Sequence, residues 1–215
     1  MIAPPPACPV CTAAPVAAFT VIDGRRYWAC PRCEARFLDA GHHPSREAEH
    51  AHYLLHENDP HDPAYRRFLS KLADPLLARL PQGACGLDYG CGPGPALAAM
   101  LREAGHPMAL YDPVFAPDAE MLLRTYDFVT STETVEHFHT PAREFARMMD
   151  LVRPGGWLAI MTCFQTDDAR FADWHYRKDP THVVFYREAT FRHLAALYGW
   201  KCEIPVKDVA LLHRA

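Results

Sequence analysis

The sequence lacks the features that mark membrane-spanning, secreted and nucleic-acid-binding proteins. No stretch approaches the roughly 20 consecutive apolar residues that a membrane span needs. The first residues have neither the basic start nor the apolar core of a signal peptide, so we expect a cytoplasmic protein. Lysine and arginine form no run and the net charge is −4, which indicates no nucleic-acid surface.

What is present is the composition of an ordinary globular protein. The chain has 215 residues, of which 49% are hydrophobic and 22% charged, enough for one good core and a small appendage. Eight cysteines without a secretory signal favour metal ligation in a reducing compartment over disulfide bonds.

Four of these cysteines form two Cys-x-x-Cys pairs separated by 18 residues. They are Cys8, Cys11, Cys30 and Cys33. Four thiolates complete a tetrahedral structural zinc site, and the alternating residues between the pairs predict a hairpin around Asp23-Gly24. We expect a zinc ribbon over residues 1–40, held folded by Zn²⁺. A redox Cys-x-x-Cys motif and a chance spacing are the alternatives.

A histidine-rich segment, residues 41–63, follows the ribbon. Its histidines are interleaved with acidic and aromatic residues, which predicts an amphipathic helix that lies over the active-site mouth as a lid. His52 and His56, one helical turn apart, are placed to share an ion. The alternative is a solvated connector with paired imidazoles. A second helical pattern runs from Asp62 to Arg79.

The rest of the chain is organised around a glycine-rich turn. A short apolar run ends in Asp88, glycines follow at positions 90, 92 and 94, and a helical pattern covers residues 96–104. Such a turn lets the backbone approach a ligand, and the helix start offers free N–H groups. The spacing differs from the Gly-x-Gly-x-x-Gly of a dinucleotide fold. A plain glycine-rich turn is the alternative.

Further strands follow in the order of a doubly wound sheet. Residues 108–112 predict a second strand ending in Asp112, 24 residues after Asp88, where a carboxylate can hold ribose hydroxyls. Residues 126–130 predict another strand, and a Pro-Gly-Gly turn leads into a further one that ends near residue 160.

These motifs together resemble the class I S-adenosylmethionine-dependent methyltransferases over roughly residues 64–215. The resemblance implies an α/β, Rossmann-like sheet with strand order 2-1-4-5-7-6 and an antiparallel last strand near Ile204–Leu211. It also implies a pocket for the methionine part of S-adenosylmethionine at the glycine turn, with the ribose on Asp112. The cofactor-binding residues assigned on this basis are Asp88, Gly90, Cys91, Gly92, Gly94, Asp112 and Thr130.

The chain departs from the family at one point. Only 13 residues separate Asp112 from Tyr126, where the usual fold fits a helix, a strand and a loop. We therefore expect the edge strand after the ribose acid to be missing and one brief helix near residues 119–124 to take its place. The usual acid beside the adenine is then lost, which leaves adenine recognition open.

Acidic residues and histidines cluster after the strand at residues 126–130. If Glu133 opens a helix, Glu136 and His137 share its face, at the sheet edge where open α/β folds bind ligands. His182, in the later stretch Asp179-Pro180-Thr181-His182, is available as a further ligand. This donor set suits Mg²⁺, Mn²⁺, Fe²⁺ or Zn²⁺. The alternative is a helix-capping Glu133, a solvated Glu136 and a His137 that merely lines the pocket.

The Glu-x-x-Glu-His pattern with a later histidine is similar to two metal-dependent groups, the ubiquinone-biosynthesis O-methyltransferases and the small-RNA 3′-terminal 2′-O-methyltransferases. The resemblance implies a second divalent ion at Glu133, Glu136, His137 and His182. Such an ion lowers the pKa of an acceptor hydroxyl and fixes its oxygen in line with the donor. Without a metal, His137 or His182 would act as the general base.

The expected function is metal-assisted O-methylation of a small-molecule hydroxyl, with Glu136, His137 and His182 as catalytic residues. The acidic balance favours a small-molecule acceptor. RNA methylation, at a 2′-oxygen or a base, is an alternative, because similar cysteine knuckles precede the methyltransferase domain in some bacterial rRNA guanine methyltransferases. Nitrogen, carbon and sulfur acceptors stay open, as does the oligomeric state. A further alternative is an inactive scaffold that docks a partner through its zinc ribbon.

Overall fold

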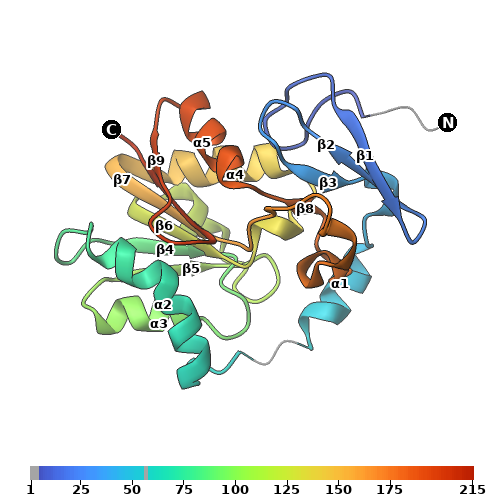
Figure 1. Cartoon of the computed structure of the whole chain (residues 1–215). Helices are drawn as coiled ribbons and strands as arrows, with labels where there is room; N and C mark the ends of the chain where they lie inside the picture. Colours follow the sequence, from blue (N-terminus) through green and yellow to red (C-terminus); the bar gives the residue numbers. More distant parts are fainter. Residues whose placement is uncertain (1–4, 56–57) are drawn as a thin grey trace.

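The computed structural model describes residues 5–55 and 58–215 (Figure 1). Its strands form two sheets, one of six strands and one of four. Short 3₁₀ helices occur between them: η1 (Ala40–His42), η2 (Ala119–Leu123), η3 (Val135–His137), η4 (Phe171–Asp173) and η5 (His175–Lys178). Within the described ranges, no helix has the length and apolar character that crossing a membrane requires.

The larger sheet has the strand order predicted from the sequence. Its strands are β4 (Gly86–Tyr89), β5 (Met108–Tyr111), β6 (Tyr126–Thr132), β7 (Val152–Met161), β9 (Lys201–Glu203) and β10 (Val209–His213). They lie in the order β5-β4-β6-β7-β10-β9. The first four pair in parallel, and β10 is antiparallel to both of its neighbours. The expectation of a doubly wound sheet with an antiparallel last strand is confirmed.

The edge of this sheet is shortened as expected. β5 is its outer strand, and between β5 and β6 the chain forms only η2, which packs against β5. The 13 residues between Asp112 and Tyr126 are all described, and they contain no strand. The usual edge strand is therefore absent from this part of the chain.

Helices cover both faces of the larger sheet (Figure 1). They are α2 (Pro63–Leu77), α3 (Ala96–Glu103), α4 (Pro141–Leu151) and α5 (Glu188–Leu197). Successive strand residues point to opposite faces. In β7, Leu158 and Ile160 accordingly join the core that contains residues of α4 and α5, whereas Ala159 and Met161 join the core of α2 and α3. The sheet thus separates two cores, as a doubly wound fold requires.

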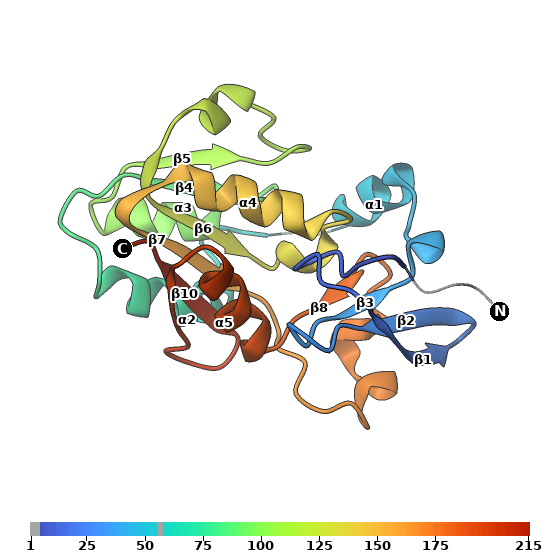
Figure 2. The ribbon, with the colours of Figure 1, turned by 90° about the horizontal axis from the view of Figure 1, so that it is seen from above.

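The smaller sheet contains the predicted hairpin and one strand from far along the chain. Its strands are β1 (Ala17–Ile22), β2 (Arg25–Ala29), β3 (Arg36–Leu38) and β8 (Val184–Phe185), in that order. Asp23 and Gly24 connect β1 to β2, both at positive φ, which suits a two-residue hairpin turn. β8 pairs antiparallel with β3 (Figure 2). The ribbon is therefore completed by a strand from the C-terminal half of the chain.

The ribbon also shares a hydrophobic core with the larger sheet. Cys8 and Trp28 belong to the same cluster of buried residues as Phe145 and Val129. At the rim of this contact, the Arg36 guanidinium donates hydrogen bonds to both carboxylate oxygens of Asp168, at 3.1 and 2.8 Å. The domain boundaries at residues 40 and 63 stay predictions. Buried residues of the ribbon and of the larger sheet belong to one hydrophobic core, so the packing does not stop at residue 40.

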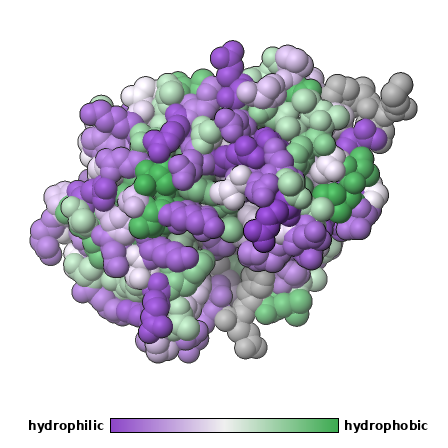
Figure 3. Space-filling model, viewed as in Figure 1, coloured by the Kyte–Doolittle hydropathy of each residue, from purple (hydrophilic) through white to green (hydrophobic). Residues whose placement is uncertain are grey.

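The histidine-rich segment contains the helix α1 (Arg46–Tyr53), which the Ser45 hydroxyl caps by accepting a hydrogen bond from the Ala48 N–H at 3.3 Å. Leu54 and Leu55 follow and are 62% and 74% exposed. On the face seen in Figure 3, apolar residues form small areas separated by polar ones. The predicted ion shared by His52 and His56 cannot be placed, since His56 lies outside the described residues.

The core facing α4 and α5 yields a stability prediction. Leu158 is completely buried in β7, whereas Leu123 in η2 is 85% exposed. Leu158→Ala should lower the free energy of unfolding by about 2–5 kcal/mol, because it removes buried methyl groups and leaves a cavity. Leu123→Ala is the matched control and should change it by less than about 0.5 kcal/mol. Urea unfolding measures both, and equal effects would show that the core is assigned wrongly.

Candidate active site

A cavity of about 830 Å³ opens at the carboxyl ends of β4, β5 and β6, within the size range of small-molecule sites. Backbone and side chains of the glycine turn, residues 90–93, line it on one side. Residues 111–115 and residues 132–140 form further walls, and α1 contributes Tyr53 and three other side chains. The cavity therefore lies where the sequence places the ligand site.

The glycine turn is fixed by contacts with two other segments. Gly90 has φ +77°, and a Cβ there would lie 2.2 Å from the methyl group of Thr134. The Thr134 hydroxyl lies 3.1 Å from the Gly90 carbonyl oxygen and 2.9 Å from that of Thr132, and its one proton is shared between them, which ties the end of β6 to the turn. A Cβ on Gly94 would lie 1.8 Å from the Asn58 carbonyl oxygen. The connector thus crosses directly over Gly94, which does not itself line the cavity.

Asp112, the predicted ribose acid, lines the cavity and organises the loop around it. One carboxylate oxygen, Oδ1, accepts the N–H groups of Val114 and Phe115 at 2.8 and 2.9 Å. The other, Oδ2, accepts the Gly92 N–H at 3.1 Å. A carboxylate oxygen can accept two hydrogen bonds. Oδ2 accepts one bond from the residues described and so retains capacity for a hydroxyl in the cavity.

Asp88 and Thr130 lie beneath the cavity instead of lining it. Asp88 is 2% exposed, and the fully buried Thr130 hydroxyl donates to its carboxylate at 2.8 Å. Burial raises the pKa of Asp88 to about 6, although the Thr130 hydrogen bond opposes this rise. That Thr130 contacts a cofactor stays a prediction. Within the chain its hydroxyl bonds Asp88.

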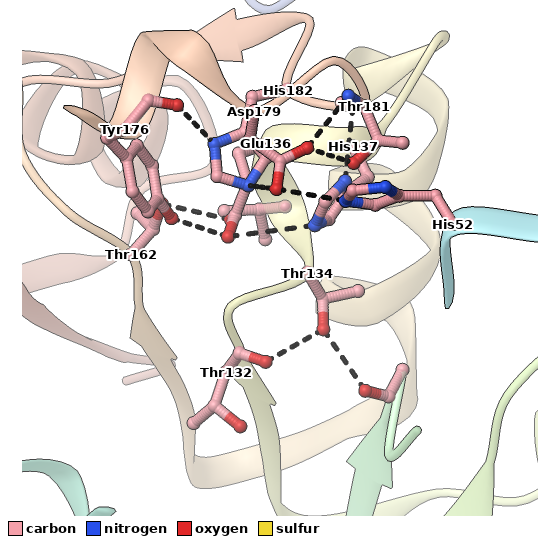
Figure 4. Close-up of polar contacts among 12 residues, drawn as sticks. His52, Thr132, Thr134, Glu136, His137, Thr162, Tyr176, Asp179, Thr181 and His182 are labelled. Atoms are coloured by element: carbon pink, nitrogen blue, oxygen red, sulfur yellow. Dashed lines mark hydrogen bonds and ion pairs between the residues drawn. The ribbon is translucent and has the colours of Figure 1, made fainter. Parts of the chain in front are cut away.

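Three of the four predicted metal ligands meet at one wall of the cavity (Figure 4). Ligand atoms of Glu136, His137 and His182 all lie within 4.8 Å of one another. His137 Nε2 is 4.0 Å from Glu136 Oε1, and the rings of His137 and His182 have centroids 4.7 Å apart. Since His182 is 45 residues from His137 along the chain, the fold brings this group together.

Backbone carbonyl groups orient both imidazoles. His137 Nδ1 lies 3.1 Å from the Thr181 carbonyl oxygen, and His182 Nδ1 lies 2.7 Å from that of Tyr176. A carbonyl can only accept, so each Nδ1 carries a proton and each Nε2 presents its lone pair to the group. Burial lowers the pKa of His137, which favours its neutral form. Metal-binding histidines are held in this way through their other ring nitrogen.

Glu136 is completely buried, and its carboxylate accepts two hydrogen bonds from hydroxyl groups. The Tyr176 hydroxyl donates to Oε1 at 2.5 Å, and the Thr162 hydroxyl donates to Oε2 at 3.0 Å. Sequence reasoning did not assign these partners to Glu136, because they lie 40 and 26 residues away along the chain. Both donors therefore fix the orientation of the Glu136 carboxylate beside the two imidazoles.

Glu133, the fourth predicted metal ligand, does not open a helix as expected. The predicted helix opening at Glu133 is wrong: the residue has φ +48°, and a single 3₁₀ turn, η3, follows it. The one-face spacing therefore does not apply, since the left-handed backbone at Glu133 separates it from η3. Glu133 lines the cavity outside the three-residue group. Burial, together with the nearby charge of Glu136, raises its pKa.

Helix α1 packs against the histidine group. His52 Nε2 lies 3.3 Å from Asp179 Oδ2, and the Tyr53 ring meets that of His137 edge-on at 5.4 Å. Asp179 Oδ2 is also 3.9 Å from His182 Nε2. Although burial alone would raise the pKa of Asp179, hydrogen bonds from Thr181 hold it at about 2. Asp179 is thus a second carboxylate beside the group that the sequence did not single out.

A polar group at the α4 side of the cavity was also not predicted. The Tyr89 hydroxyl donates to Glu144 at 2.5 Å, and Arg147 lies 3.4 Å from both. The Tyr111 ring packs against Tyr89 with centroids 5.2 Å apart. All four side chains line the cavity next to β5, the outer strand.

A family model described as a methyltransferase domain matches residues 61–203. The curated proteins contain no match. Among solved structures, 1,6-didemethyltoxoflavin-N1-methyltransferase of Burkholderia thailandensis, with bound 1,6-didemethyltoxoflavin and S-adenosylhomocysteine, aligns at 16% identity and TM-score 0.51 over 93% of this chain and 99% of that one. Streptomyces venezuelae DesVI aligns at 14% identity and TM-score 0.51 over 80% and 100%.

An O-methyltransferase family protein from Burkholderia thailandensis aligns at 17% identity and TM-score 0.48 over 78% of this chain. The alignment covers 63% of that protein, so this chain spans less than two thirds of its length. At these identities the likeness is one of fold.

The raised pKa of Asp88 makes stability depend on pH in a defined direction. Between about pH 4 and pH 6 the folded state keeps a proton on Asp88 that the unfolded state releases, so rising pH lowers stability. Asp88→Asn removes this dependence. Relative to the variant, the wild type should lose about 2–3 kcal/mol of unfolding free energy between pH 4 and pH 7. Urea unfolding at both pH values, with exposed Asp173→Asn as control, measures the difference, and parallel curves for wild type and Asp88→Asn would contradict it.

Proposed function

The chain belongs to the methyltransferase domain family, and from this premise we propose that it is an S-adenosylmethionine-dependent enzyme that methylates a small-molecule hydroxyl with the help of a divalent ion. One observation carries the proposal: Glu136, His137 and His182 converge on a wall of the same cavity that the glycine turn lines. A methyl donor on the turn and an acceptor oxygen at this wall would share one enclosed space.

The residues around the glycine turn fit the cofactor. Backbone of Gly90, Cys91 and Gly92 faces the cavity, and Asp112 Oδ2 retains capacity for a ribose hydroxyl. Asp88 lies just beneath the turn, and a positively charged amino group above it would favour its ionised form. S-adenosylmethionine supplies a methyl group on a sulfonium centre, and the protein's part is to align it with the acceptor.

The donor set at the opposite wall fits a divalent ion. His137 and His182 offer Nε2 lone pairs and Glu136 offers a buried carboxylate, the two-histidine, one-carboxylate combination that binds first-row metals. Such an ion lowers the pKa of a bound hydroxyl. Glu133 and Asp179 stay candidates for a further ligand. If no ion binds, His137 Nε2 is placed to accept the acceptor's proton.

The four ribbon cysteines fit one tetrahedral zinc ion. The sulfur atoms of Cys8 and Cys33 are 3.8 Å apart and those of Cys11 and Cys30 are 3.7 Å apart. Zinc–sulfur bonds of about 2.3 Å in a tetrahedron place the sulfurs about 3.8 Å apart. Backbone N–H groups also reach two of the sulfurs at 3.4 Å. We assign this zinc a structural role.

Two other functions compete with this proposal. An RNA acceptor is favoured by the ribbon and by the Glu-x-x-Glu-His pattern, and the net charge of −4 argues against it. An inactive scaffold would have no need for the complete set of glycine turn, Asp112 and histidine group. Methyl transfer from labelled S-adenosylmethionine, assayed in parallel on a panel of phenols and catechols and on short RNA, separates the three.

The cofactor proposal predicts the effect of removing the ribose acid. Asp112→Ala should weaken the binding of S-adenosylhomocysteine by about 1.5–3 kcal/mol, because hydrogen bonds to a charged acceptor are lost. Titration calorimetry measures this. Asp118→Ala is the control, since Asp118 caps η2 through the Glu120 N–H and does not line the cavity. If Asp112→Ala binds S-adenosylhomocysteine with unchanged affinity, Asp112 does not bind the ribose.

The metal proposals predict two ions per chain. Protein supplied with zinc and Mn²⁺ should retain one zinc in the ribbon and bind a second ion that His182→Ala loses, because that variant removes one of three ligands. Elemental analysis after desalting counts the ions. Exposed His175→Ala serves as the control and should keep both. If the wild type binds only the ribbon zinc and still transfers methyl groups when no other ion is present, the metal-assisted mechanism is wrong.

A further inference from the structure

The zinc ribbon is bonded directly to the segment that carries His182. β3 begins three residues after Cys33 and pairs with β8, and the Leu38 N–H donates to the Val183 carbonyl oxygen at 2.8 Å. The Val183 N–H in turn donates to the Glu136 carbonyl oxygen at 2.9 Å. Val183 is therefore held on one side by the ribbon and on the other by the turn that carries Glu136.

The first cysteine knuckle contacts the element that follows His137. The carbonyl oxygen of Pro9, between Cys8 and Cys11, accepts the Ala142 N–H at 2.9 Å. Ala142 lies in the first turn of α4, where N–H groups have no partner within the helix. Thr140 at the N-cap supplies no side-chain hydrogen bond. The knuckle thus takes the place of a capping side chain.

Tyr186, in the same buried cluster as the four cysteines, bonds η3. It is completely buried, and its hydroxyl donates to the Val135 carbonyl oxygen at 2.8 Å, in the turn that continues to Glu136 and His137. Burial first, then the charges of Glu136 and of the Cys8 and Cys33 thiolates, raise its pKa. Tyr186 thus belongs to the same buried cluster as the four cysteines and bonds the active-site turn.

We propose that the four-cysteine cluster and Tyr186 position Glu136, His137 and His182, so that loss of the ribbon zinc disables the acceptor side of the cavity and spares the cofactor side. The inference rests on the proposed zinc site. Tyr186 is a positioning residue, since it acts through the backbone at Val135. The cofactor side has further supports outside η3, the pairing of β4 with β5 and the Asp112 bond to Gly92, in addition to the Thr134 bond to Gly90.

A pair of matched variants tests the Tyr186 half of the proposal. Tyr186→Phe and Tyr126→Phe each remove a phenol that donates to a backbone carbonyl oxygen at 2.8 Å, but Tyr126 bonds Met121, far from the histidine group. In the zinc-loaded full chain, Tyr186→Phe should raise amide hydrogen exchange in residues 135–142 and 181–186 by roughly tenfold, because a buried carbonyl loses its partner. It should also weaken Co²⁺ binding at the histidine group, read from visible absorption.

The control separates positioning from a general loss of stability. Tyr126→Phe should leave both segments and the Co²⁺ spectrum as in the wild type, and both variants should bind S-adenosylhomocysteine with wild-type affinity. If the two variants behave alike, Tyr186 has no positioning role.

Removal of the zinc tests the other half. Cys33→Ser, which removes one of the four zinc ligands, should show at least tenfold faster exchange in residues 135–142 and 181–186, with residues 86–104 changed less than about threefold. Retained protection of both segments after zinc loss overturns the proposal. If the purified wild type never contains zinc, the zinc assignment and the positioning role of the cysteine cluster are both wrong. The comparison of Tyr186→Phe with Tyr126→Phe then still decides the positioning role of Tyr186. Failure to bind S-adenosylhomocysteine counts against the proposed activity alone.

Discussion

The antiparallel pairing of β3 with β8 is the contact on which much of this structure depends. It gives the N-terminal ribbon a fourth strand and places Val183 between the ribbon and Glu136. It also lets the cysteine cluster join the core that faces α4 and α5 instead of forming a separate small core. A module of about forty residues buries little apolar surface alone, so sharing a core with a larger sheet is a route to stability in addition to a metal.

The cavity concentrates buried acidic groups whose ionised forms are costly. Burial raises the pKa of Asp88 beneath the glycine turn and of Glu133 on the wall. Glu136, completely buried, receives two neutral hydrogen-bond donors and no cation within the chain as described. Charges of Arg102 and Lys71 oppose these pKa shifts without cancelling them, so a positively charged ligand would favour the ionised carboxylates further.

The shortened sheet changes what surrounds the cofactor cavity. With β5 as the outer strand, the region that an edge strand would occupy is bordered by η2 and α4. Tyr111, Tyr89, Glu144 and Arg147 line the cavity there. These side chains are two aromatic rings, a carboxylate and a guanidinium, joined through the Tyr89 hydroxyl. The loss of one strand has therefore left a polar, aromatic wall in place of an open edge.

The strand order was implied by the family that the motifs resemble. The sequence by itself determined the absence of the edge strand, the ribbon hairpin and the positions of the glycine turn, Asp112 and the four cysteines. Each of these depends on local spacing: apolar runs, glycines at fixed intervals, paired cysteines and the length of one connection. Only the tertiary structure decided that the Thr130 hydroxyl bonds Asp88, that Glu133 has a left-handed backbone instead of opening a helix, that Tyr176 and Thr162 bond Glu136, and that β8 completes the ribbon. The physical reason is that these features depend on contacts between distant residues and on a left-handed turn, neither of which leaves a periodic pattern in the chain.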